Sequence, residues 1–144
     1  LQFLQFTPRQ VLHALKARLA NVKKVTAGSE IGYGRSKVEK DTHIGTINIG
    51  HADGYQPSRS KNTTYVLIGG KRTAVLDHEA MNQTIIELPD HHYQVGDEVV
   101  IVGKQGDEEI TLAEICQGQM GTTNLTRFTA QLHATRLPRL LVDR

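Results

Sequence analysis

The sequence predicts a mainly β fold, a small antiparallel β-barrel-like domain with one or two short helices. Short segments rich in β-branched and apolar residues follow one another closely, and turn signals separate most of them. Only one later segment has the clear pattern of a helix. The chain has 144 residues, enough for one domain with a sizeable core. Since no repeat or linker interrupts the pattern, we expect residues 1–144 to form a single domain.

The first segment has two interpretations. Thr7-Pro8 could begin a helix with proline at its first position, whereas the alternation of apolar side chains over residues 11–21 equally suits a strand. The following segments are clearer. We expect a strand over residues 42–50, and two strands over residues 63–76 around Gly69-Gly70, a dipeptide typical of a tight hairpin turn.

The second half of the chain continues in the same way. Residues 83–89 and 97–103 are β-branched and apolar, which predicts two more strands. Residues 108–122 contain the expected helix, because Thr111 with Glu114 three residues later fits a capping box and glycines follow. The tail, residues 128–142, alternates and ends in apolar residues, so it is predicted to be a strand.

Composition excludes several classes of protein. The net charge is +2, with 17 basic and 15 acidic residues and only short basic pairs, so no nucleic-acid partner is expected. The one cysteine, Cys116, rules out an intramolecular disulfide and disfavours a cysteine-based metal site. No stretch approaches the ~18 apolar residues of a spanning helix, and no signal peptide is visible. We therefore expect a cytoplasmic protein without a membrane segment.

Two clusters of polar residues suggest chemistry without supporting it. Neighbouring residues on a strand point to opposite faces, so His91 and His92 are not expected to share a metal ion, and no metal site is predicted. Residues 77–79, Asp-His-Glu, have the residue types of a charge relay. No serine or cysteine stands in the context of a nucleophile, however, so a solvated turn is the simpler interpretation.

Tyr33 stands between two glycines in the stretch AGSEIGYGRS. In one interpretation the glycines form a turn and the ring covers an edge of the core. In the other, the glycines allow the backbone to approach a ligand closely and present the phenol to it.

Two further stretches are short and ambiguous. In residues 49–55, IGHADGY, the dipeptide Asp53-Gly54 is a turn signal, which alone suggests a hairpin turn with a solvated aspartate. In residues 80–83, AMNQ, a methionine precedes a strong strand, and a methionine is more often a core residue than a site residue.

The order of these motifs is more specific than any one of them. GYG is followed by I-G-x-A-D-G-Y, by M-x-Q before a strand, by VGDEVVIVGKQGDE, by a helix, by G-T-x-N and finally by R-x-P-R. This series resembles the C-terminal domain of alanine racemase, a pyridoxal-phosphate-dependent isomerase that interconverts L- and D-alanine. The similarity extends from about Thr7 to Leu141.

The resemblance implies a larger enzyme. In the family, an N-terminal (β/α)8 barrel carries pyridoxal phosphate on a lysine, and a mostly β domain follows. The enzyme is a head-to-tail homodimer in which each barrel mouth is closed by the partner's C-terminal domain. This chain resembles the second domain only, because a barrel needs ~250 residues. The isolated chain is therefore expected to be inactive, and its implied partners are the barrel domain, a second copy and a small amino acid. The implied role is D-alanine supply for peptidoglycan in the bacterial cytoplasm.

The resemblance also assigns roles to residues. Tyr33 matches the tyrosine that carries a proton on one face of the substrate Cα, opposite the cofactor lysine. Met81 matches a methionine whose backbone amide contacts the substrate carboxylate, and Asn82 beside it is assigned to the same substrate-binding position. His51 and Asp53 match positions along the path by which substrate reaches the site.

Several positions depart from the family pattern. His51 replaces a tyrosine, Asn82 replaces an aspartate, and Asp77-His78 replaces a Gly-Arg pair. Leu125 replaces a tyrosine that reaches the cofactor phosphate. Three alternatives therefore stay open beside an alanine racemase domain: a racemase of another amino acid such as serine, a catalytically degenerate domain kept for dimerisation, and a β-barrel binding module of another kind.

Overall fold

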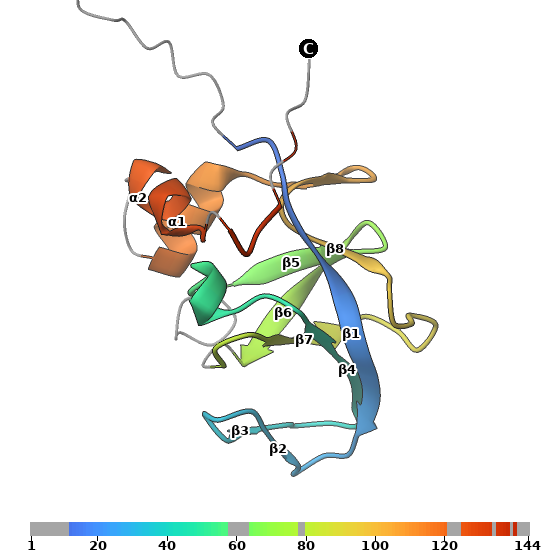
Figure 1. Ribbon diagram of the computed structural model, residues 1–144. Coiled ribbons are helices and arrows are strands. Elements are labelled where there is room, and N and C mark those ends of the chain that lie inside the picture. Colours follow the sequence, from blue (N-terminus) through green and yellow to red (C-terminus); the bar gives the residue numbers. More distant parts are fainter. Residues whose placement is uncertain are drawn as a thin grey trace, which may run out of the picture.

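The computed structural model describes residues 12–57, 64–77, 80–120, 125–133, 135–138 and 140. Its main sheet consists of β1 (Leu15–Val25), β4 (Thr42–Ile47), β5 (Tyr65–Ile68), β6 (Lys71–Asp77), β7 (Thr84–Leu88), β8 (Glu98–Gln105) and β9 (Glu108–Ile110). The strand order is β1-β4-β7-β6-β5-β8-β9, and β1 also pairs with β8, so six strands close into a ring (Figure 1). All these pairings are antiparallel, which confirms the barrel-like β fold.

β1 closes the ring. Its first half pairs with β8 through Leu15–Arg18 and its second half with β4 through Leu19–Val25, with a shift of register after Leu19. The buried positions alternate with exposed ones at the start of the strand, as the period of a half-buried strand requires. The strand interpretation of the first segment is thus confirmed. The alternative helix beginning at Thr7-Pro8 lies outside the described residues.

The hairpin predicted around Gly69-Gly70 is confirmed. β5 and β6 pair as neighbours, and Gly69 and Gly70 have φ values of 56° and 74°. Two consecutive residues with positive φ are the requirement of a type I′ turn, whose twist matches that of the flanking strands.

The core reaches both faces of β5 and β8. Val66, Leu67 and Ile68 are all buried, and so are the four residues of 99–102. Strands buried on both faces carry continuous apolar runs, and here helices supply the outer cover. α1 (Leu112–Met120) contributes Ile115 and Cys116, and α2 (Leu125–Gln131) contributes Phe128, to the same core cluster (Figure 1).

The strand predicted for the tail is wrong where the structure describes it. Residues 128–131 form the second half of α2, and residues 132, 133 and 135–138 are not in a strand. Phe128 and Leu132, four residues apart, both pack on the core, while Ala130 between them is exposed. A spacing of four brings side chains to one face of a helix, so the apparent alternation was accidental.

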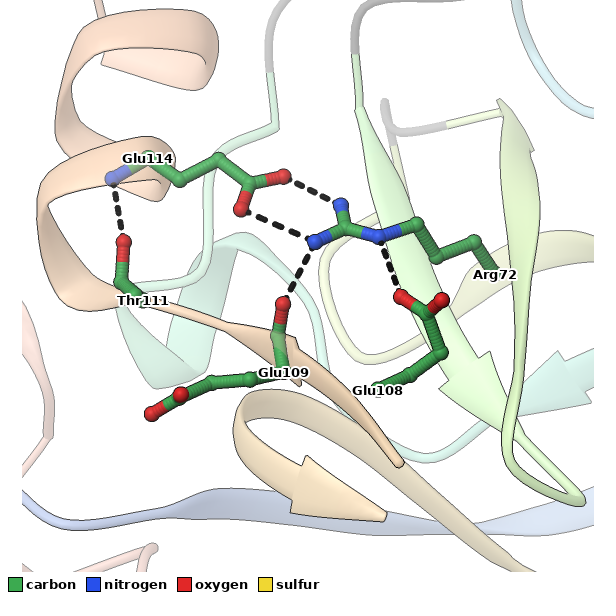
Figure 2. A network of polar contacts seen from close by, with 5 residues as sticks. All are labelled: Arg72, Glu108, Glu109, Thr111 and Glu114. Carbon is green, nitrogen blue, oxygen red and sulfur yellow. Dashed lines mark hydrogen bonds and ion pairs between the residues drawn. The ribbon is translucent and has the colours of Figure 1, made fainter. Parts of the chain in front are cut away.

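The start of α1 confirms one half of the predicted capping box. The Glu114 N–H donates to the Thr111 hydroxyl over 3.1 Å. The Glu114 carboxylate instead binds Arg72 on β6, which also contacts Glu108 (2.9 Å) and the carbonyl oxygen of Glu109 (Figure 2). The hydrogen bonds that the Arg72 guanidinium donates to the carboxylates of Glu114 and Glu108 raise its pKa. The side chains are partly exposed, so each pair contributes at most about 1 kcal/mol, yet together they attach α1 to the barrel.

A second, smaller hairpin lies across the outside of the barrel. β2 (Glu30–Ile31) and β3 (Ser36–Lys37) form a separate two-stranded sheet (Figure 1). The side chains of Ile31 and Val38 pack with Ile44 of β4 in a cluster of their own, and Leu76 and Ile85 of β6 and β7 pack against it. Their neighbours Val75 and Ile86 pack in the main core instead. Because successive strand residues face opposite sides, the hairpin covers the outer face.

In the part of the chain that the structure describes, no helix is both long and apolar enough to cross a membrane.

Candidate functional site

The glycines around Tyr33 build a tight turn at the tip of the β2–β3 hairpin. Gly32 has a φ of +67°, and the Arg35 N–H donates to the Gly32 carbonyl over 3.4 Å. A Cβ on Gly32 would lie 2.0 Å from a carboxylate oxygen of Asp77, so only glycine fits here. The Tyr33 residue itself is 78% exposed. The interpretation in which its ring covers a core edge is therefore wrong, and the turn presents the phenol outwards.

Asp77 ends β6 directly beneath this turn and is buried. The solvated turn expected for residues 77–79 is therefore wrong for Asp77, because the β2–β3 hairpin covers it. His78 and Glu79 lie outside the described residues. Four residues further along the chain comes Met81, so its Cα lies at most roughly 14 Å from that of Asp77.

The chain after β4 and the chain before β7 lie side by side, because β4 and β7 are paired. Ile47 pairs with Thr84, so the chain after β4 runs beside the chain before β7. The Thr84 hydroxyl donates to the Ile49 carbonyl over 2.7 Å, and the Ala52 N–H donates to the Met81 carbonyl over 2.8 Å. The His51 N–H donates to the carbonyl of residue 80 over 3.3 Å. His51 and Met81, far apart in sequence, thus lie close together.

Asp53 is not the solvated turn residue that its sequence suggests. It ends η1 (His51–Asp53), a short 3-10 turn, and is 4% exposed. One carboxylate oxygen accepts the Gly50 N–H over 2.9 Å, and the other accepts Nε of Arg136 over 2.7 Å. A second nitrogen of Arg136 donates to Oδ1 of Asn82 over 2.7 Å. The sequence indicated Arg136 only as part of the R-x-P-R motif and gave it no role.

α2 packs against the end of η1. A Cβ on Gly54 would lie 2.0 Å from the carbonyl oxygen of Gln131, and the His133 N–H donates to the Asp53 carbonyl over 2.9 Å. Leu125 begins α2, six residues and about 9 Å along the helix axis from Gln131.

We call Tyr33, His51, Met81, Asn82 and Leu125 together the candidate surface; they belong to the turn of the β2–β3 hairpin, to η1, to the chain before β7 and to the start of α2. Figure 1 shows the tip of the β2–β3 hairpin, the chain just before β7, η1 and α2 on the same side of the domain in this view. Large apolar or aromatic side chains are usually buried. Among the described residues, the exposed ones are Tyr33, Met81, Val95, Leu125 and Leu140, and three of these five belong to the candidate surface.

The candidate surface does not coincide with the cavity of about 550 Å³ that the described residues form. That cavity lies at the start of β4, the first half of β6 and the end of β7. Its lining includes the positively charged Lys40 and Arg72 and the negatively charged Asp41 and Glu87. None of the candidate residues lines it. The candidate surface is open on this chain, so a second body would have to cover it to enclose a substrate.

His91 and His92 lie in the loop between β7 and β8, not on a strand as expected from the sequence. The His91 ring lies 6.3 Å from that of His43, measured between centroids, whereas His92 contacts Asp90 and stacks on Tyr93 at 4.2 Å. Among the residues that the structure describes, no three histidine, cysteine, aspartate or glutamate side chains come together in a metal-binding arrangement.

The candidate surface does not by itself fit pyridoxal phosphate. That cofactor needs a lysine for its Schiff base and donors for its phosphate. The five residues of the candidate surface include no lysine, and the aliphatic side chain of Leu125 cannot donate a hydrogen bond.

Comparison with known proteins gives a consistent picture. The model of the family "Alanine racemase, C-terminal domain" matches residues 12–140. Alanine racemase 1 of Bacillus subtilis (strain 168) is 36% identical over 140 residues, covering 96% of this chain and 34% of that protein. The alanine racemase of Carboxydothermus hydrogenoformans is 38% identical over 142 residues, covering 94% of this chain and 38% of that protein.

Solved structures agree. The crystal structure of alanine racemase from Oenococcus oeni superposes with a TM-score of 0.79 at 34% identity, covering 90% of this chain and 34% of that one. Alanine racemase from Bacillus anthracis, solved with bound L-Ala-P, gives a TM-score of 0.75 at 30% identity, covering 83% of this chain and 30% of that one. The chain thus spans about a third of the length of the relatives it matches.

Proposed function

The chain belongs to the family of alanine racemase C-terminal domains, and on this premise we propose that it supplies one half of a racemase active site. In this proposal Tyr33 carries a proton to or from the substrate Cα, and the backbone of Met81 binds the substrate carboxylate. The substrate is a small amino acid, with alanine as the first candidate. His51 lies along the path by which substrate reaches the site, and the buried Asp53 supports that segment from beneath.

The exposure of Tyr33 on a fixed turn is the observation that carries the proposal. The turn packs against the Asp77 side chain at Gly32, while Tyr33 is 78% exposed and is not part of the core. Racemisation removes a proton from one face of Cα and returns one to the other face, so two groups must flank that carbon. Bound pyridoxal phosphate supplies delocalisation of the negative charge at Cα. A tyrosine at one face acts as the acid or base.

Met81 has the backbone geometry for an anion contact. Its carbonyl oxygen is held by the Ala52 N–H of η1, which fixes the orientation of the segment. Among the described residues, none accepts a hydrogen bond from the Met81 N–H. A backbone N–H donating to a carboxylate forms a charge-assisted hydrogen bond, which explains how an apolar residue serves a binding position.

The remainder of the active site would come from a barrel domain of the same family, with its lysine and its cofactor. A homodimer in the bacterial cytoplasm would then bring the barrel of one protomer against the candidate surface of its partner and supply D-alanine for peptidoglycan. The openness of the candidate surface supports this arrangement. The isolated chain should be inactive for the same reason.

Tyr33→Phe in the complete protein tests the catalytic role. Loss of a general acid–base group should lower turnover by about 10²–10⁴-fold while the fold survives. Exchange of the Cα hydrogen with solvent should persist better from the enantiomer whose proton goes to the lysine. Tyr65→Phe is the matched control, since Tyr65 lies at the separate cavity, and it should keep full turnover. Full activity of Tyr33→Phe would exclude the proposed role.

One observation favours a second candidate, a degenerate domain kept for dimerisation. Leu125 cannot make the phosphate contact that the resemblance assigns to its position. The complete protein distinguishes the two candidates: a cofactor absorbance band that borohydride bleaches, with racemisation of alanine or serine, supports the enzyme. A dimer with neither property supports the second candidate.

A further inference from the structure

Arg136 joins two segments that are distant in sequence. Its Nε donates to Oδ1 of Asp53 over 2.7 Å, and its Nη2 donates to Oδ1 of Asn82, also over 2.7 Å. Asp53 lies 83 positions before Arg136, and Asn82 lies 54 positions before it. The guanidinium therefore bridges η1 and the chain before β7 from a third place in the fold.

The Asp53 end of this bridge is well anchored. The Asp53 side chain is 6% exposed, and its second oxygen accepts the Gly50 N–H over 2.9 Å. The Asp53 carbonyl also accepts the His133 N–H over 2.9 Å, which ties the chain leading to Arg136 to the same turn. An ion pair with one partner this enclosed is less screened by water than a surface pair.

The Asn82 end acts on Met81. Asn82 is exposed and follows Met81 directly, so fixing its side chain limits the rotation of the backbone between the two residues. From the other side, the Ala52 N–H holds the Met81 carbonyl over 2.8 Å. Both restraints lead back to η1, one directly and one through Arg136.

We infer that Arg136 is a positioning residue for substrate binding: by clamping Asn82 to Asp53 it holds the Met81 N–H in place for the substrate carboxylate. The inference rests on the proposed function, because it names what that binding position depends on. A planar guanidinium with donors in a fixed fork satisfies both acceptors at once, whereas a lysine ammonium is a single point charge on a flexible stem. Arg136→Lys therefore keeps the charge and loses the bridge.

The test measures steady-state racemisation by the complete protein. Arg136→Lys should raise KM for alanine by about tenfold and leave kcat within about twofold, since a carboxylate contact serves the ground and transition states alike. Asn82→Ala removes the other end of the bridge and should act in the same way, and the double variant should be no worse than either single one. Arg18→Lys is the matched control, because Arg18 donates one bond over 2.8 Å to the Gly96 carbonyl on another part of the barrel.

The outcomes separate this inference from the proposed function. A wild-type protein without racemase activity would overturn both. An active wild type in which Arg136→Lys leaves KM unchanged would overturn the inference alone, even if the melting temperature falls, because a purely structural bond affects stability without affecting KM. A loss confined to kcat would also overturn it. If Arg136→Lys fails to fold, the KM of Asn82→Ala decides, since Asn82 is exposed.

Discussion

Gly32→Ala adds one methyl group at a position where both the backbone and a neighbouring side chain oppose it. The φ of +67° is in the left-handed region, which costs an L-residue with a Cβ about 1–2 kcal/mol. The new Cβ would also lie 2.0 Å from Oδ2 and 2.1 Å from Cγ of Asp77, and overpacking of this kind costs about 1–3 kcal/mol. We expect a total loss of about 2–5 kcal/mol in the free energy of unfolding.

Gly28→Ala is the matched control. Gly28 also has a positive φ, +84°, but nothing lies within 4 Å of the position that its Cβ would take. This variant should therefore lose only the backbone cost of about 1–2 kcal/mol. Urea unfolding of the chain, followed by circular dichroism, gives both values, provided that the slope m is the same in the two variants.

Removing the Asp77 side chain should abolish the extra loss of stability that Gly32→Ala shows compared with Gly28→Ala. In the double variant with Asp77→Gly, which also removes the Asp77 Cβ lying 2.7 Å from the new methyl group, the loss caused by Gly32→Ala should fall toward that of Gly28→Ala, a favourable coupling of about 1–3 kcal/mol. Equal losses in Gly32→Ala and Gly28→Ala, or no relief in the double variant, would refute the contact between the GYG turn and Asp77.

Two further predictions concern α1. Thr111→Ala should lower the free energy of unfolding by about 1 kcal/mol, because the Thr111 hydroxyl caps the Glu114 N–H. Thr111→Ser keeps a hydroxyl and should keep most of that stability. An unchanged urea midpoint in Thr111→Ala would contradict the prediction. The Cys116 thiol is buried, and desolvation by that burial raises its pKa. A thiol reagent should modify Cys116 only as the domain unfolds. The folded chain holds the thiol proton more tightly than the unfolded chain does, so the free energy of unfolding should fall as the pH rises above the ordinary thiol pKa. Rapid labelling under native conditions at neutral pH would refute the second prediction.

Local chemistry determined what the sequence could reveal of the fold. The type I′ turn at Gly69-Gly70 and the cap at Thr111 depend on neighbouring residues, so both could be predicted. The tail could not, because Phe128, Ala130 and Leu132 fit a period of two as well as a helical face. Only packing against α1 and the core distinguishes the two, and that information lies outside the segment.

The candidate site shows the same contrast between features that depend on neighbouring residues and features that depend on distant ones. The order of the motifs indicated Tyr33 and Met81, and the structure describes both as exposed. The environment of Asp53 could not be predicted, because its ion pair depends on a residue 83 positions away. The turn dipeptide Asp53-Gly54 suggested a solvated carboxylate, whereas burial with Arg136 makes this carboxylate part of the support beneath the surface.

Asp77 shows how one departure from the family pattern can leave a site intact. The resemblance places a glycine at this position, and the larger carboxylate here needs space. That space exists because position 32 is glycine, whose missing Cβ leaves room for the Asp77 side chain. The turn still forms and Tyr33 is still presented, so the larger residue at 77 is compatible with the proposed role of the phenol. Of the departures at described residues, Leu125 is then the stronger argument against catalysis, because its aliphatic side chain cannot make the phosphate contact that the resemblance assigns to this position.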